Sequence, residues 1–172
     1  MINEPRERTF HWEDPMKVAK EAMTMAGHDY FQAMNDGKLP FPPLLNTLDF
    51  KVESIEKGKA VFTFEPQEFH YNPIGTVHGG VISAILDSAM GCSIHSLLPA
   101  GTGYTTLELK VNFLKAITIK SGELRAVGKV IHSGSRTALV EAQLIDKNNT
   151  IYAHGTSTCM IFNMNPEQIK NK

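Results

Sequence analysis

The stretch HYNPIGTVHGGVISAILDSAMGCSIHSLL, residues 70–98, decides the fold of this chain. A turn-rich lead, Asn72-Pro73-Ile74-Gly75, is followed from about Gly79 to Leu98 by twenty residues without proline. Their apolar side chains fall on nearly every side of a 3.6-residue period, which predicts a core helix enclosed on most faces. Its only acidic residue is Asp87, and several serines make the segment a poor membrane span.

Asp87 and the helix start are the chemically informative features. A carboxylate inside a buried helix is costly unless it is paired, hydrated or used in chemistry, so Asp87 is either a hydrogen-bonded structural group or a reactive one. Gly79 and Gly80 follow His78 and leave backbone N–H groups that suit an anion or an oxyanion, although a glycine pair also permits tight packing against a strand. The joint presence of Asn72, His78, Gly79 and Asp87 favours chemistry.

The spacing along this helix predicts a site shared between chains. Gly79 and Asp87 are eight residues apart, which is about 12 Å of helix at roughly 1.5 Å per residue. One substrate carbon could hardly touch both groups of one helix. If both act on the same bond, they come from two copies of the chain, and the active site lies at a dimer interface.

A family resemblance follows from these residues. The pattern Asn-Pro-x-Gly-x-x-His-Gly-Gly, then Asp87, then TTLELKVNFL at 105–114, resembles the hotdog-fold acyl-CoA thioesterases, in particular their phenylacetate-type (PaaI-like) branch. The resemblance covers about Leu45 to Phe162. It implies an α+β hotdog fold, in which an antiparallel β-sheet wraps around one long central helix. It also implies an acyl-CoA substrate, no cofactor beyond the coenzyme A of that substrate, and a homodimer or a homotetramer built from two dimers.

Composition bounds the remaining possibilities. With 172 residues the chain fits one domain with a sizeable core, and its formal net charge of −1 gives no general attraction to nucleic acid or to an anionic membrane. Cys92 and Cys159 lie in apolar surroundings typical of small core residues. The N-terminal segment has no apolar run of the kind found in secretion signals. We therefore expect a cytoplasmic protein without nucleic-acid or membrane partners.

The chain divides into three parts. Residues 1–44 are predicted to form a helical extension packed on the same domain, residues 45–163 the hotdog domain, and residues 164–172 a tail. Asp14-Pro15 is a good helix opening, and a second helical piece is predicted at 28–35. Prolines at 40, 42 and 43 indicate extended chain. Residues 39–45 either cover one side of the ligand groove or simply pack on the domain.

Strand patterns flank the central helix. A hairpin is predicted at 47–56 and 59–66, with Lys57-Gly58 as its turn. After the helix, Leu107, Leu109, Val111 and Phe113 alternate with polar residues, as in a half-buried strand. Further alternating runs lie at about 121–132, 136–146 and 150–162. An antiparallel sheet around one helix accounts for this order of elements.

The resemblance assigns roles to five candidate catalytic residues. The Gly79 N–H is expected to polarise the thioester carbonyl, while Asp87 of the partner chain activates water or attacks directly. Asn72 would orient the carbonyl or the water, or else caps its own Asn-Pro turn. His78 would position the helix start or transfer protons.

Thr106 enters through a departure from a related branch of the family. That branch places a hydroxyl residue one helical turn after its acid, where this chain has Gly91. The water must then be held from elsewhere, and Thr106, at a strand position that often carries an assisting hydroxyl, is the candidate. Ordinary sheet packing would explain a strand threonine equally well.

Coenzyme A carries phosphates, so donors are expected near the mouth of the groove. Gly134, Ser135 and Arg136 form a turn with backbone and side-chain donors, and we assign them, with Gly80, to substrate or CoA binding. A plain hairpin turn is the alternative. The scattered histidines do not resemble a metal site, and no metal is expected.

The sequence is also compatible with two other functions. A hotdog acyl-CoA hydratase or dehydratase would bind the same ligand but would bring a histidine and an acid to the α and β carbons of the acyl chain. A non-catalytic acyl-CoA-binding module would keep the groove without needing Asp87. The combination of Asn72, Gly79 and Asp87 favours the thioesterase.

Overall fold

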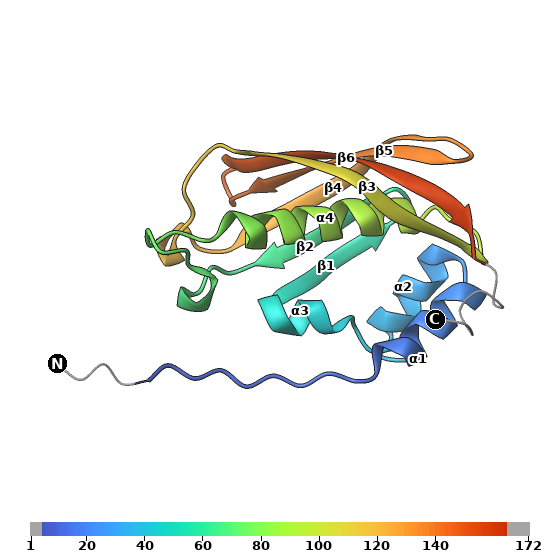
Figure 1. The fold of residues 1–172 in the computed structure, drawn as a ribbon, viewed down its shortest axis with the longest axis horizontal. Coiled ribbons are helices and arrows are strands. Elements are labelled where there is room, and N and C mark those ends of the chain that lie inside the picture. Colours follow the sequence, from blue (N-terminus) through green and yellow to red (C-terminus); the bar gives the residue numbers. More distant parts are fainter. Residues whose placement is uncertain (1–4, 165–172) are drawn as a thin grey trace.

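One antiparallel sheet and one long helix form the body of the protein. The computed structural model describes residues 5–164. Its strands are β1 (Phe50–Glu56), β2 (Lys59–Phe64), β3 (Thr102–Phe113), β4 (Leu124–Ser133), β5 (Thr137–Ile145) and β6 (Ile151–Asn163), in the spatial order β1-β2-β4-β5-β6-β3. The sheet curves around helix α4, Gly79–His95 (Figure 1). The predicted α+β arrangement is confirmed.

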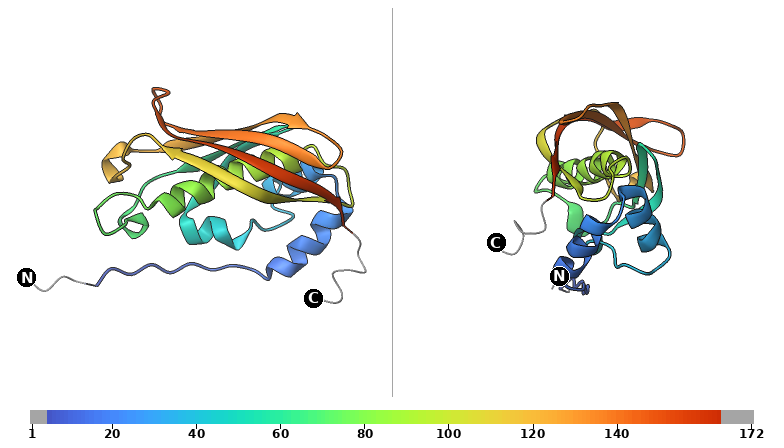
Figure 2. Two further views of the ribbon diagram at one scale, coloured as in Figure 1. Left: turned by 45° about the horizontal axis from the view of Figure 1, so that its top comes forward. Right: turned by 90° about the vertical axis from the view of Figure 1, so that its right-hand side faces the viewer.

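Helix α4 supplies the centre of the core. The end-on view in Figure 2 shows the sheet curving around it. Because side chains on several faces of the helix must be covered, its sequence is apolar nearly all round rather than along one stripe. The fully or almost fully buried members are Ile82, Ile85, Leu86, Ala89, Met90 and Ile94. The buried helix predicted from residues 79–98 is therefore present, and it ends at His95.

Three helices precede the sheet: α1 (Pro15–Thr24), α2 (Gly27–Asn35) and α3 (Pro43–Leu48). Helix α1 begins as predicted, with the Asp14 carboxylate accepting a hydrogen bond of 2.9 Å from the Met16 N–H. The prediction of extended chain through the third proline is wrong, because Pro43 starts α3. Proline is well suited to the first turn of a helix, where its missing N–H costs nothing.

The N-terminal helices attach to the C-terminal end of α4. A Cβ at Gly27 would lie 2.6 Å from the carbonyl carbon of His95, so only glycine allows this approach. The Gly27 N–H also donates to the Leu98 carbonyl oxygen over 2.9 Å. The His95 ring packs edge-on against Tyr30 and Phe31 at centroid distances of 5.6 and 5.4 Å. These contacts hold the extension on the same core.

Strand β3 differs most from its prediction. It begins at Thr102, and its register shifts at a bulge between Thr106 and Glu108. Leu107 and Phe113 are 56% and 55% exposed, whereas the alternating pattern predicted that both would face the core. The bulge turns Leu107 outward, and β3 is an edge strand with no neighbour on one side. The predicted tail lies outside the described residues apart from Met164, and the domain boundaries stay predictions.

A close approach between sheet and helix gives a stability prediction. A Cβ at Gly128 in β4 would lie 2.5 Å from the Ala89 carbonyl oxygen of α4. We expect Gly128→Ala to lower the free energy of unfolding by about 2 kcal/mol, because helix and sheet must move apart. The measurement is urea unfolding at one fixed protein concentration.

A matched control exists on β6, two strands away in the sheet. A Cβ at Gly155 would meet Lys110 O and Met90 Cε at 3.4 Å, the edge of ordinary contact. Gly155→Ala should therefore change the free energy of unfolding by less than about 1 kcal/mol. Equal losses in the two variants would contradict the tight packing inferred at Gly128.

Candidate functional site

The first turn of α4 offers one open backbone amide. His78 is the N-cap, and its Nδ1 accepts a hydrogen bond of 2.8 Å from the Gly80 N–H. The Gly79 N–H makes no hydrogen bond to any other residue between 5 and 164. It lies at the positive end of the helix dipole, where an oxyanion is stabilised. The cap gives His78 and Gly80 a structural use, and their predicted contacts with substrate stay predictions.

Asn72 closes the loop that precedes this helix. Its Oδ1 accepts hydrogen bonds from the Ile74 and Thr76 N–H groups at 3.1 and 3.2 Å, and its Nδ2 donates to Thr76 Oγ1 over 2.9 Å. The self-capping Asn-Pro turn is thus present. An amide nitrogen carries two hydrogens, so one remains for a ligand. Asn72 is held in place beside the helix start, and its catalytic role stays a prediction.

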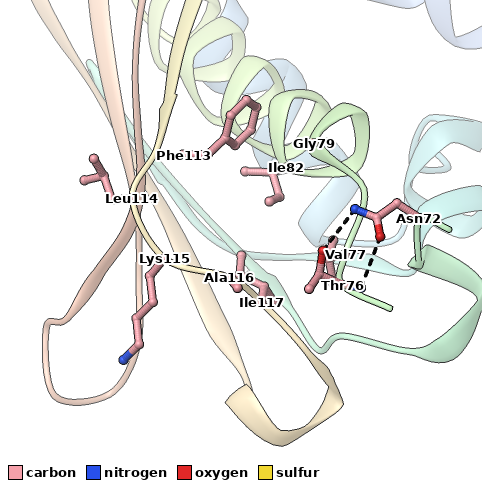
Figure 3. Close-up of a pocket in the computed structure, with 10 residues that line it drawn as sticks. All are labelled: Asn72, Thr76, Val77, Gly79, Ile82, Phe113, Leu114, Lys115, Ala116 and Ile117. Carbon is pink, nitrogen blue, oxygen red and sulfur yellow. Dashed lines mark hydrogen bonds between the residues drawn. The ribbon is translucent and has the colours of Figure 1, made fainter. Parts of the chain in front are cut away.

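A pocket of about 300 Å³ joins Asn72 to Gly79 (Figure 3). The Phe113 ring lies beside the first turn of α4, where a Cβ at Gly79 would come within 3.1 Å of the ring. Glycine at this position therefore makes room for the ring. The full lining is Asn72, Thr76, Val77, Gly79, Ile82, Phe113, Leu114, Lys115, Ala116 and Ile117. Asp87 is not part of this pocket.

Asp87 and Thr106 meet on the other side of α4. The Thr106 hydroxyl donates a hydrogen bond of 3.0 Å to Asp87 Oδ1. Thr106 lies at the β3 bulge, a feature that commonly re-aims a side chain near active sites. No other hydrogen bond to the Asp87 carboxylate is present within the described residues, so Oδ2 is open to a ligand. The structure brings these two predicted catalytic residues together.

A second pocket, of about 180 Å³, contains Asp87. Asp87 is the only charged side chain in its lining, and most of the others are apolar or aromatic. The lining comprises Phe31, Met34, Phe41, Pro42, Leu44, Leu45, Val52, Ile55, Phe62, Asp87, Ser88, Cys92 and Tyr104. Residues 41–45 form one wall, which agrees with the interpretation that this segment covers a ligand groove. The chain thus places a single carboxylate at an apolar cavity.

Cys92 in this pocket is not a nucleophile. Burial, and then the nearby charge of Asp87, raise the pKa of the Cys92 thiol to about 12. The thiolate is the reactive form of cysteine, and it is absent at neutral pH under these conditions. Asp87 is therefore the candidate reactive group of the pocket, and its catalytic role stays a prediction.

The predicted CoA-binding turn lies elsewhere in the chain. Gly134, Ser135 and Arg136 line a hollow of about 560 Å³ together with Leu97 to Pro99, which follow the C-terminal end of α4. The turn is exposed, so the Arg136 guanidinium can meet a solvated phosphate. Its function stays a prediction.

The candidate residues of one chain are therefore divided among three hollows. The first contains Asn72 and Gly79, the second Asp87, and the third the turn at 134–136. Gly79 and Asp87 remain separated by about 12 Å of helix, at roughly 1.5 Å per residue. None of these three hollows, as lined by the described residues, combines the amide with the acid.

The described residues offer neither a metal site nor a membrane-spanning helix. Within residues 5–164, no three His, Cys, Asp or Glu side chains are grouped so that they could hold a metal ion. In the same range no helix has the length and apolar character needed to cross a bilayer.

Comparison with known proteins places this geometry in a family. The sequence model of the thioesterase superfamily matches residues 74–153. A putative esterase of Sulfurisphaera tokodaii is 33% identical over 112 residues, which cover 65% of this chain and 81% of that protein. The chain belongs to the thioesterase superfamily. Within it, a 1,4-dihydroxy-2-naphthoyl-CoA hydrolase of Listeria monocytogenes is 28% identical over 63% of this chain and 86% of its own length.

Solved structures of the superfamily agree in fold. A putative thioesterase of Ralstonia eutropha, described as a phenylacetic acid degradation-related protein, has a TM-score of 0.69 at 27% identity and covers 76% of this chain and 98% of its own. A Streptococcus mutans protein bound to acetyl CoA has a TM-score of 0.61 at 28% identity, over 67% and 90% of the two chains. The hotdog fold and the resemblance to the phenylacetate-type branch are confirmed.

Sequence reasoning missed part of this thioesterase-superfamily site. Tyr104 lines the Asp87 pocket but was not among the predicted residues. A signal for it exists, because side chains two apart on a strand point to the same face and Thr106 was already a candidate. The pocket wall from α2, formed by Phe31 and Met34, has no such signal, since its position depends on how the extension folds back.

Proposed function

We propose that the protein hydrolyses acyl-CoA thioesters to a carboxylic acid and free CoA, at sites formed between two chains. The observation that carries the proposal is the division of the open Gly79 amide and the Asp87 carboxylate between separate pockets of one chain. A site that combines one chain's amide with the other chain's acid has the two groups that acyl transfer needs.

The chemistry follows from these two groups. The Gly79 N–H donates to the thioester oxygen, which gains negative charge as the carbonyl carbon becomes tetrahedral. Asp87 takes the proton of an attacking water, or attacks the carbon itself and is later released by water. In the first route the C–S bond breaks, that proton passes to the CoA sulfur, and the acyl group leaves as an acid. In the second route the C–S bond breaks to give a mixed anhydride with Asp87 and a CoA thiolate; water then cleaves the anhydride, which releases the acid and the Asp87 carboxylate, and its proton goes to the thiolate.

The free edge of β3 supports the pairing of two chains. Strand β3 ends the sheet, has twelve residues and exposes the apolar side chains of Leu107 and Phe113, and Leu114, which follows it directly, is exposed as well. Antiparallel pairing with β3 of a second copy would satisfy its unpaired backbone groups and join the two sheets. Both α4 helices would then lie on one face in opposite directions, so that the N-terminus of one approaches the body of the other.

The Asp87 pocket is suited to the acyl group. Its volume of about 180 Å³ is similar to that of a cavity of about 150 Å³ that stays dry and binds benzene in another protein. This size fits a single ring or a medium-length chain. The turn at Gly134, Ser135 and Arg136 is the proposed contact for the CoA phosphates. The Listeria relative, named a CoA hydrolase, and the acetyl-CoA-bound Streptococcus structure support this substrate class.

Release of free thiol from a panel of acyl-CoAs tests the function. The panel contains straight-chain and aromatic acyl groups, and a thiol reagent reports the CoA set free. We expect release at a rate that depends on the acyl group. A hydratase would instead change the absorbance of an enoyl-CoA without freeing thiol, and a binding module would retain acyl-CoA unchanged. Absence of release across the panel would reject the hydrolase.

Acyl selectivity should depend on the wall that α3 contributes. Leu44 lines the Asp87 pocket and lies outside the sheet and α4. We expect Leu44→Ala to raise kcat/KM for acyl groups two carbons longer than the best wild-type substrate by about tenfold, since roughly 0.8 kcal/mol is gained per additional buried methylene. Kinetics over a series of chain lengths measure the shift.

Leu139→Ala is the matched control for this prediction. Leu139 is a partly exposed leucine on β5 that does not line the pocket. The Leu139→Ala substitution should leave the dependence of kcat/KM on acyl chain length unchanged. An identical profile for Leu44→Ala and wild type would show that α3 does not limit the acyl group.

A further inference from the structure

The Tyr104 hydroxyl occupies the position where a side chain at Gly91 would begin. A Cβ at Gly91 in α4 would overlap the Tyr104 hydroxyl and come within 2.9 Å of the carbon that bears it. Glycine inside a helix costs about 1 kcal/mol relative to alanine and needs a reason. The reason here is that the Tyr104 hydroxyl, reaching in from β3, fills the space that a side chain at position 91 would take.

This space is next to Asp87. Residues four apart on a helix are neighbours, with about 5–6 Å between their side-chain origins, and position 91 is four residues after Asp87. The hydroxyl therefore stands beside the carboxylate along the same face of α4. Asp87 and Tyr104 also line the same pocket. Two hydrogen bonds of about 2.8 Å span such a gap through one water molecule.

The hydroxyl is available to a ligand. Within residues 5–164 the Tyr104 hydroxyl makes no hydrogen bond. The ring is held in place by its close packing against Gly91. Burial raises the pKa of Tyr104 well above its ordinary value, and the nearby Cys92 and Asp87 side chains, when ionised, raise it further. The group is therefore a protonated donor at neutral pH, in a pocket that otherwise has few polar groups.

Thr106 uses its one donor on Asp87, and its predicted contact with the water stays a prediction. The sequence suggested that its hydroxyl would hold the water, but it donates its proton to Asp87 Oδ1. Thr106 thus fixes the carboxylate of a residue that lines the pocket, and within residues 5–164 Oδ2 has no hydrogen-bond partner. The donor for a water bound to Oδ2 must come from another residue, and Tyr104 is the unengaged hydroxyl in that pocket.

We infer that Tyr104 is a catalytic residue whose hydroxyl holds the attacking water against Asp87. The inference rests on the proposed thioester hydrolysis and assigns Asp87 the role of base. The water donates one hydrogen to Asp87 Oδ2 and accepts a hydrogen bond from Tyr104. Its oxygen bonds to the carbonyl carbon, Asp87 takes its proton, the C–S bond breaks, and the proton passes to the departing CoA sulfur.

Tyr104→Phe tests the inference, because it keeps the ring over Gly91 and removes only the hydroxyl. We expect kcat for thiol release to fall about 10- to 100-fold, in the range of a lost hydrogen bond to a reacting group, with KM within about twofold of wild type. The melting temperature should stay the same. An unchanged kcat in an enzyme whose wild type is active would overturn the inference and leave the proposed function intact, whereas an inactive wild type would remove the proposed function itself.

A rescue experiment separates the hydroxyl from packing. Tyr104→Ala empties the space beside Gly91 that the tyrosine hydroxyl fills. Adding Gly91→Ser places a hydroxyl in that space from α4. The Tyr104→Ala/Gly91→Ser variant should recover at least about tenfold in kcat over Tyr104→Ala. The Tyr104→Ala/Gly91→Ala variant fills the same space without a hydroxyl and should recover nothing. Equal recovery by the serine and alanine variants would assign Tyr104 a packing role and overturn the inference.

Discussion

Asp87→Asn is expected to lower kcat for thioester hydrolysis by about 1,000-fold, within the range for loss of a general base. Asparagine keeps an oxygen that can accept the 3.0 Å hydrogen bond from Thr106, so the local fold should persist. The carboxylate charge and its proton affinity are lost. Initial rates of thiol release, with the melting temperature as a check on folding, measure the effect.

Asp29→Asn provides the control for this substitution. Asp29 is exposed in α2 and lies outside the three hollows. It should retain wild-type kcat and KM. If Asp87→Asn also released thiol at the wild-type rate, the carboxylate would have no part in the reaction.

Mixing two inactive variants is expected to restore activity. In the proposed dimer each site takes Asn72 and Gly79 from one chain and Asp87 from the other. A mixed dimer of Asn72→Ala and Asp87→Asn chains then has one doubly altered site and one site with both native residues. Random exchange of equal amounts makes about half of the dimers mixed, so about a quarter of wild-type activity should return. Tagged chains, purified as mixed dimers, allow the gain to be assigned.

The control for this experiment mixes two variants of the same residue. Asp87→Asn with Asp87→Ala leaves no site with a native carboxylate, so no activity should return. Verified mixed dimers of the first pair that stay as inactive as their parents would show that each site is built within one chain.

The sequence allowed the central helix and its acid to be predicted because both are local features. A long apolar run without proline can form only a buried helix here, and an acid within it is conspicuous. The five strands other than β3 were placed by alternation and turns, with ends shifted by a few residues, as expected when neighbouring strands decide where pairing stops. The self-capping of Asn72 was also readable, since Asn-Pro turns have this geometry.

The features that could not be predicted depend on tertiary contacts. Tyr104 meets Gly91 only because β3 and α4 pack at a particular register, and the bulge after Thr106 is not encoded by an obvious glycine or proline. The same bulge makes the prediction that Leu107 is buried wrong, because it turns this side chain outward. Helix α3 was missed because three prolines indicate extended chain, while the last of them occupies a position where proline starts a helix.

The two sides of the Asp87 pocket have different origins in the chain. One side belongs to α4 and β3, which also build the core, while the wall at 41–45 comes from a segment that precedes the sheet. In the proposed thioesterase, variation in that segment would change the accepted acyl group without disturbing Asp87 or the sheet. The groups proposed for hydrolysis and the choice of acyl group would therefore diverge independently among related sequences.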